Sequence, residues 1–133
     1  MSTTKIANAN VLRILVVDDE PVMRKYVADT LRRLGIQSIA TASDGKDALQ
    51  IMASFKPDLI LTDIHMKPMG GLEFVRLLRS VPNPAISKIR VIFMSADAST
   101  DTLEAALPLG SFGFIVKPPR MDTLKAKLEL ALG

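Results

Sequence analysis

The chain contains no cysteine and no tryptophan, and aromatic residues make up only 5% of its 133 positions. The absence of cysteine removes thiol chemistry and disulfides from the possible functions. No apolar run approaches the ~20 residues that a membrane-spanning helix needs. Residues 1–10 are polar and lack the hydrophobic run of a secretory signal. We therefore expect a flexible N-terminal tail over residues 1–10 and a soluble, cytoplasmic protein that does not insert into membranes.

A strong charge of one sign is also missing. The net charge is +3, from 17 basic and 14 acidic side chains. The two basic dipeptides, Arg24–Lys25 and Arg32–Arg33, have no aromatic residues interleaved with them. The composition therefore gives no support for direct binding of nucleic acid.

Aliphatic residues are abundant instead, and hydrophobic residues reach 48% of the chain. The length fits one compact domain, which we expect over residues 11–133. A domain of this size buries roughly two-thirds of its unfolded surface, so it needs no disulfide or structural metal.

Short apolar runs alternate with amphipathic stretches five times along the chain. The runs expected to form strands are 13–17, 37–42, 58–62, 89–94 and 113–116. Apolar residues at helical spacing predict five helices, through residues 23–34, 48–55, 72–78, 99–107 and 121–131. Near-continuous apolar strands that alternate with helices predict an α/β fold, a doubly wound parallel sheet with helices on both faces.

Polar residues occur where these strands end. Asp18 and Asp19 follow the first strand, and Asp63 follows the third. Ser95 ends the fourth strand and Lys117 ends the fifth. The carboxyl ends of parallel strands lie at one edge of a sheet, where ligands bind. The predicted topology therefore brings these five side chains together.

Each of the five side chains also has an ordinary interpretation. The aspartates could be solvated or cap a helix, Ser95 could cap the next helix, and Lys117 could lie on the surface. As a group they indicate a site for a cation, because three neighbouring carboxylates repel one another unless a cation lies between them. Mg2+ prefers such oxygen ligands, and a lysine provides a positive charge suited to phosphate.

The ordered set Asp18-Asp19, Asp63, Ser95-Ala96 and Lys117-Pro118 resembles the receiver domains of bacterial two-component response regulators. The resemblance covers about residues 12–132. Among receivers, the chain resembles the single-domain chemotaxis response regulators. It implies a flavodoxin-like, five-stranded parallel sheet of order 2-1-3-4-5 with five helices.

The same resemblance assigns roles to individual residues. Asp63 is the implied phosphoacceptor, Ser95 and Lys117 bind the phosphoryl group, and Phe114 occupies the place of a rotating switch aromatic. The Lys117–Pro118 bond is expected to be cis, which is accessible at low cost only before proline. The implied Mg2+ ligands are Asp19, Asp63, the main-chain carbonyl of His65 and, through water, Asp18.

The implied function is that of a stand-alone response regulator in a two-component system or phosphorelay. A phosphohistidine on a histidine kinase or phosphotransfer protein is the expected donor, and an unidentified protein is the expected output target. The chain would be a phosphoacceptor with slow self-phosphorylation and self-dephosphorylation, not a turnover enzyme. We expect a monomer or a weak homodimer. We also expect a partner surface formed by Phe112, Arg120 and Lys125, unless Phe112 fills core instead.

Two other functions fit parts of the pattern. A pseudo-receiver would keep the fold as an interaction module without phosphorylation, and failure to bind Mg2+ would favour it. A phosphatase of the haloacid-dehalogenase type would use Asp18 as its nucleophile. Such enzymes need an acid/base aspartate two residues later, where this chain has Glu20. Slow hydrolysis of an added phosphomonoester would favour that alternative.

Overall fold

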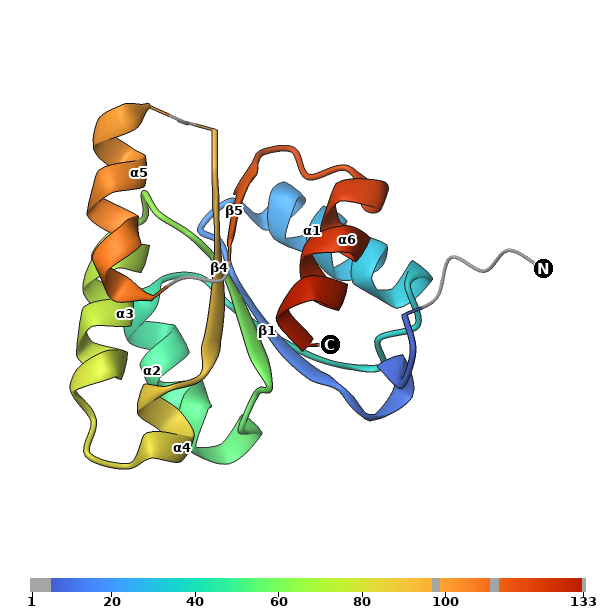
Figure 1. The fold of residues 1–133 in the computed structure, drawn as a ribbon, viewed down its shortest axis with the longest axis horizontal. Helices are drawn as coiled ribbons and strands as arrows, with labels where there is room; N and C mark the ends of the chain where they lie inside the picture. Colours follow the sequence, from blue (N-terminus) through green and yellow to red (C-terminus); the bar gives the residue numbers. More distant parts are fainter. Residues whose placement is uncertain (1–5, 97–98, 111–112, 133) are drawn as a thin grey trace.

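The computed structural model describes residues 6–96, 99–110 and 113–132. Five parallel strands form one sheet in the order β2-β1-β3-β4-β5 (Figure 1). The strands are β1 (Arg13–Val17), β2 (Ser38–Ala42), β3 (Leu59–Asp63), β4 (Arg90–Ser95) and β5 (Gly113–Val116). This order confirms the predicted flavodoxin-like sheet.

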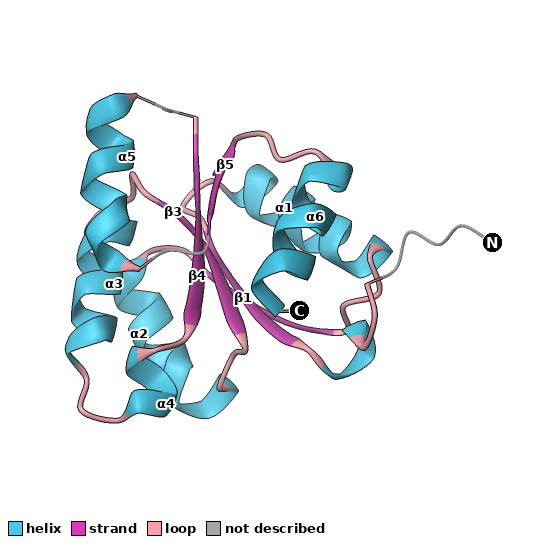
Figure 2. Cartoon of the chain, viewed as in Figure 1, coloured by secondary structure: helices cyan, strands magenta, loops and turns pink. Residues whose placement is uncertain are grey.

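Helices cover both faces of the sheet (Figure 2). The α-helices are α1 (Pro21–Arg33), α2 (Gly45–Phe55), α3 (Gly71–Ser80), α4 (Pro84–Ser87), α5 (Thr100–Ala106) and α6 (Met121–Leu132). Two short 3-10 helices are η1 (Ala9–Val11) and η2 (Leu107–Leu109). In the figures α1 and α6 lie on one face, while α2, α3 and α5 lie on the other. None of the helices in the described ranges is long and apolar enough to cross a membrane.

The central strands are buried on both faces because alternate side chains point in opposite directions. Ile14 and Val16 of β1 pack in the core that α1 and α6 cover. Leu15 and Val17 pack in the core beneath α2, α3 and α5. A strand in this position must be apolar at nearly every residue, which explains its continuous hydrophobic run.

The five predicted helices are present, together with the short α4, which the sequence analysis did not predict. Only four residues long, α4 is too short to show helical periodicity. Its start is stabilised locally, because the side chain of Asn83 accepts a hydrogen bond from the Ala85 amide and Pro84 occupies the first turn. Strand ends shift by one residue in β2, β3 and β4 relative to the prediction.

Core packing begins earlier in the chain than residue 11. Ile6 and Ala9 are buried in the core formed with α1 and α6. The Ile6 amide also donates a 2.8 Å hydrogen bond to the carbonyl of Leu34. The expectation of a flexible tail over residues 1–10 is therefore corrected for residues 6–10. A single isoleucine in a polar segment shows no periodicity from which this packing could be predicted.

Candidate functional site

Polar side chains gather at the carboxyl edge of the sheet. Val17 and Thr62 are partners in the β1–β3 register, so the residues that follow them, Asp18 and Asp63, emerge side by side. Asp18 is fully buried and Asp63 is only 5% exposed. Carboxylate oxygens of Asp18, Asp19, Glu20 and Asp63 all lie within 4.8 Å of one another. The topology thus brings the predicted aspartates together and adds a fourth acid to them.

Both carboxylate oxygens of Asp63 are held in place. Oδ1 accepts a 2.7 Å hydrogen bond from the Ile64 amide. Oδ2 accepts a 2.9 Å hydrogen bond from Nζ of Lys117. The carboxylate is therefore oriented before any ligand arrives.

A close backbone contact fixes the strand end that carries Asp63. The Gly71 amide, at the start of α3, donates a 2.9 Å hydrogen bond to the carbonyl of Ile64. A Cβ atom added at Gly71 would overlap the main-chain oxygen of Asp63. Glycine is required here because the helix packs directly against the backbone of the strand end.

Lys117 is the cation of the site, and its side chain is only 4% exposed. Its Nζ lies 2.9 Å from Oδ2 of Asp18, 2.9 Å from Oδ2 of Asp63 and 3.3 Å from Oε1 of Glu20. Burial by itself would lower the pKa of Lys117, but hydrogen bonds and negative charges from Asp18 and Asp63 outweigh it and raise the pKa. The lysine therefore stays charged throughout the neutral range.

The chain around Lys117 is arranged to bring it to this edge. Its amide donates a 2.9 Å hydrogen bond to the carbonyl of Ser95, continuing the β4–β5 pairing. The Lys117–Pro118 bond is cis, as the sequence resemblance predicted. The hydroxyl of Tyr26 in α1 donates a 2.8 Å hydrogen bond to the carbonyl of Pro119, which ties this turn to α1.

The site carries excess negative charge. Burial and the neighbouring charges of Asp63 and Asp18 raise the pKa of Asp19. Oδ2 of Asp18 is buried and, although Lys117 is at ion-pair distance, it has no well-directed hydrogen bond within the described residues. In the part of the chain that the structure describes, four carboxylates surround one lysine, and one buried carboxylate oxygen among them has no hydrogen bond. This arrangement fits the oxygen ligands of Mg2+.

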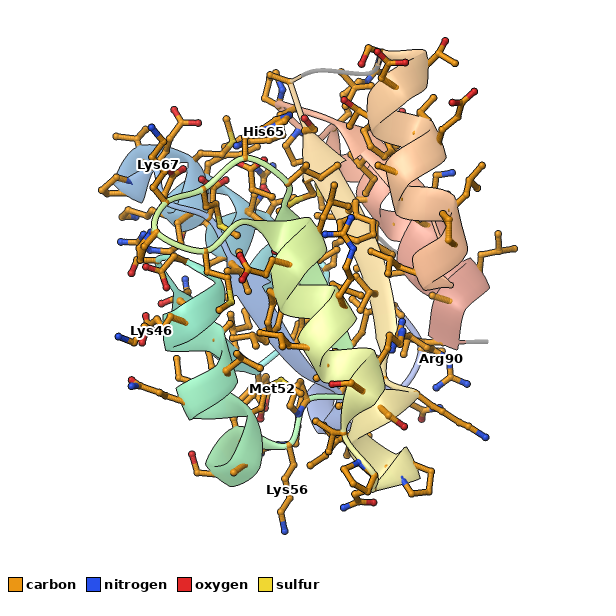
Figure 3. The ribbon with its side chains drawn as sticks, turned by 90° about the vertical axis from the view of Figure 1, so that its left-hand side faces the viewer. Lys46, Met52, Lys56, His65, Lys67 and Arg90 are labelled. Carbon is orange, nitrogen blue, oxygen red and sulfur yellow. The ribbon has the colours of Figure 1, made fainter. Side chains whose placement is uncertain are left out.

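A shallow depression of about 300 Å³ opens over these groups. Its lining is formed by Asp19, Glu20, Asp63, His65, Ser95, Ala96 and Lys117. Ser95 is buried at the end of β4, and the side chain of His65 is exposed. Figure 3 shows His65 and Lys67 on the loop between β3 and α3, at the rim of this edge. All the predicted phosphoryl-binding residues therefore border one opening.

Sequence reasoning missed two residues of this site. Glu20 belongs to the acidic group, and its amide donates a 2.9 Å hydrogen bond to Oδ1 of Asp18. Arg24, one helical turn later, donates a 2.7 Å hydrogen bond from Nη1 to the carbonyl of Asp18. The unbroken acidic run Asp18-Asp19-Glu20 was the available signal for Glu20. Nothing in the sequence indicated the direction of the Arg24 side chain.

The predicted switch and partner residues lie elsewhere. Phe114 is half-buried in β5 and packs against the core beneath α2, α3 and α5. Arg120 pairs with Asp122 at 3.2 Å, and Lys125 pairs with Glu129 at 3.4 Å. Phe112 lies outside the described residues, so the surface proposed for Phe112, Arg120 and Lys125 stays a prediction.

Comparison with known proteins identifies the family. The response regulator receiver domain model matches residues 14–129. The chain belongs to the response-regulator receiver family. It is thus a receiver domain of two-component signalling, a family of phosphoacceptors rather than conventional enzymes. This membership favours the receiver over the phosphatase alternative.

Chemotaxis proteins are among its relatives. The chain is 34% identical to chemotaxis protein CheY of Pseudomonas aeruginosa, over 89% of this chain and 94% of that protein. It is 30% identical to a probable chemotaxis protein CheY of Rhizobium etli, over 94% of this chain and 95% of that protein. These matches support the predicted likeness to chemotaxis response regulators.

A longer relative and a solved structure extend the comparison. The chain is 41% identical to a protein-glutamate methylesterase/protein-glutamine glutaminase of Desulfotalea psychrophila, but spans only 33% of that protein. The structure of CheY4 from Vibrio cholerae superposes with a TM-score of 0.80 at 28% identity, covering 90% of this chain and 98% of that one. The fold is therefore that of the CheY structures.

Proposed function

We propose that this receiver accepts a phosphoryl group on Asp63, in a Mg2+-dependent reaction, from a phosphohistidine on a histidine kinase or phosphotransfer protein. The phosphorylated state then changes binding to a separate target protein. The observation that carries the proposal is the Asp63 carboxylate, nearly buried yet facing an open depression, with Lys117 2.9 Å away.

The transfer is an in-line displacement. A carboxylate oxygen of Asp63 attacks phosphorus, the phosphorus–nitrogen bond of the donor breaks, and its electron pair leaves with the imidazole, which takes a proton from water. Lys117 places its charge beside the phosphoryl oxygens, so the protein contributes mostly position and electrostatics. The hydroxyl of Ser95 donates to a phosphoryl oxygen. Hydrolysis of the acyl phosphate returns the carboxylate and inorganic phosphate, a slow self-reaction.

The metal site of this proposal uses residues already close together. Asp19 and Asp63 would bind Mg2+ directly, together with the main-chain carbonyl of His65, and Asp18 would bind through water. A bound Mg2+ supplies positive charge that neutralises phosphoryl oxygens. The unsatisfied buried oxygen of Asp18 and the 4.8 Å spacing of the acids support this assignment.

Signal transfer is proposed to begin at Ser95. Attraction of its hydroxyl to the phosphoryl group would draw the end of β4 inward and favour a second rotamer of Phe114. Phe114 pairs in register with Phe93 of β4 and is only half-buried, which leaves the edge of β5 able to respond.

Phosphorylation by a small acyl phosphate tests the proposal. The protein is incubated with acetyl phosphate and Mg2+, and intact mass is measured. We expect the gain of one phosphoryl group, abolished by Asp63→Asn. The matched control is Asp58→Asn, the same change at the opposite end of β3, which should be phosphorylated normally. An Asp63→Asn protein that gains the group as well as the wild type does would contradict the assignment.

A further inference from the structure

The number of hydrogen-bond donors on Lys117 limits what it can bind. A lysine ammonium has three N–H groups and no acceptor. In this structure Nζ has three carboxylate neighbours, on Asp18, Asp63 and Glu20. Nζ donates hydrogen bonds to Asp63 and Glu20, whereas Asp18 is an ion-pair neighbour without a well-directed hydrogen bond among the described residues. A phosphoryl oxygen that arrives at Nζ therefore competes with the carboxylates that already surround it.

The three carboxylates around Nζ differ in how easily they can be released. Asp18 is fully buried and Asp63 nearly so, and both lie 2.9 Å from Nζ. The side chain of Glu20 is 66% exposed and lies farther away, at 3.3 Å. A released Glu20 carboxylate regains water at once, whereas a buried carboxylate that loses its partner is strongly destabilised. Glu20 is thus the acceptor with the smallest cost of release.

We propose that Glu20 is a positioning residue that accepts a hydrogen bond from one N–H group of Lys117 until a phosphoryl oxygen replaces it. This inference rests on the proposed phosphorylation of Asp63. Glu20 competes with the phosphoryl group for Lys117. Its negative charge, within 4.8 Å of the other acids, also attracts the cation that the site binds. Its two effects on the site are opposite in sign, which a merely structural role would not produce.

Calorimetric titration separates the two effects. Mg2+ is titrated first into the wild type, Glu20→Gln and Glu73→Gln. Beryllofluoride, a mimic of the phosphoryl group that needs no covalent transfer, is then titrated at saturating Mg2+. Glu73 is a matched control because it is also an exposed glutamate at the start of a helix, α3, and is outside the acidic group.

Glu20→Gln is expected to weaken Mg2+ binding and to tighten beryllofluoride binding, each by about two- to fivefold, the range of an exposed ion pair. Glu73→Gln should match the wild type in both titrations. Glu20→Asp keeps the charge on a side chain one methylene shorter. It should bind Mg2+ like the wild type but beryllofluoride like Glu20→Gln, since the contact with Lys117 is lost.

The outcomes distinguish this inference from the function on which it rests. The proposed function would be overturned if the wild type did not bind beryllofluoride. It would also be overturned if Asp63→Asn bound beryllofluoride as the wild type does. The role of Glu20 alone would be overturned by a different result. In that result the wild type binds beryllofluoride and needs Asp63 to do so, but Glu20→Gln binds it equally well or more weakly at saturating Mg2+. A Glu73→Gln protein that behaves like Glu20→Gln would also overturn it, because the effect would then be one of net charge.

Discussion

The two ends of β3 carry the same residue type in different surroundings. Asp58, just before the strand, is exposed, and its Oδ2 accepts a 2.8 Å hydrogen bond from the amide of Arg13. Asp63, the last residue of the strand, is buried, and its Oδ2 is paired with Lys117 at 2.9 Å. One aspartate completes the backbone hydrogen bonding of a strand, and the other is part of a charged cluster.

This difference teaches that position in the sheet determines what a carboxylate can do. At the amino edge, Asp58 is exposed and accepts a hydrogen bond from a main-chain amide. At the carboxyl edge, Asp63 is surrounded by three other acids within 4.8 Å and depends on one lysine and on any bound cation. Substitutions at the carboxyl edge should therefore respond to Mg2+, and those at the amino edge should not.

The largest effect is expected from removing the buried cation. Lys117→Met should lower the free energy of unfolding without Mg2+ by about 3 kcal/mol, since Asp18 and Asp63 would stay buried without a counter-charge. Because the pKa of Lys117 is raised on folding, its contribution should persist at neutral pH and disappear only as strongly alkaline pH is reached. Urea unfolding with and without Mg2+ measures this, and Mg2+ should restore part of the loss.

Lys125→Met is the control for that substitution. Lys125 forms an ion pair with Glu129 on the surface of α6, at 3.4 Å. Its replacement should change stability by less than about 0.5 kcal/mol, with no response to Mg2+. Equal losses in the two lysine variants would show that the carboxyl edge is not electrostatically distinct.

A smaller effect is expected at the junction of β3 and α3. Gly71→Ala should destabilise the fold by about 2 kcal/mol and weaken Mg2+ binding, because the new Cβ displaces the backbone of Asp63. In the control, Gly113→Ala, the new Cβ would lie 3.3 Å from Cδ of Lys127, the middle of a flexible side chain that can move. Thermal unfolding and Mg2+ titration of both variants test this, and normal Mg2+ binding by a destabilised Gly71→Ala would contradict it.

The smallest effect is expected at the amino edge. Asp58→Ala removes the acceptor of the Arg13 amide and should cost about 1 kcal/mol of stability. Chemical denaturation should give the same loss with and without Mg2+. A loss of stability that Mg2+ relieves would mean that the two ends of β3 are coupled. It would contradict the expectation that only the carboxyl edge responds to Mg2+.

Much of the fold was predictable because its causes are local and repeated. Buried parallel strands must be apolar throughout, and runs such as 14–17 show this directly. The gathering of Asp18, Asp63, Ser95 and Lys117 followed from topology alone, since all parallel strands end at one edge. None of this required knowledge of how any side chain is oriented.

The missed features depend on single contacts with no repeating pattern. Ile6 packs into the core as one isolated residue, and α4 is too short for periodicity. Glu20 and Arg24 contribute through the direction of their side chains, Glu20 towards Lys117 and Arg24 towards the carbonyl of Asp18. Helical spacing placed Arg24 in the predicted helix and left Glu20 before it, and it indicated neither of these directions.

The chemical position of the phosphoryl group tests the central claim most directly. An aspartyl phosphate is reduced by borohydride to homoserine, which marks the modified residue in a peptide mass spectrum. After treatment with acetyl phosphate and Mg2+, the account predicts homoserine at position 63, with Asp18, Asp19 and Asp58 recovered unchanged. Homoserine at one of those other aspartates, or at none, would contradict it.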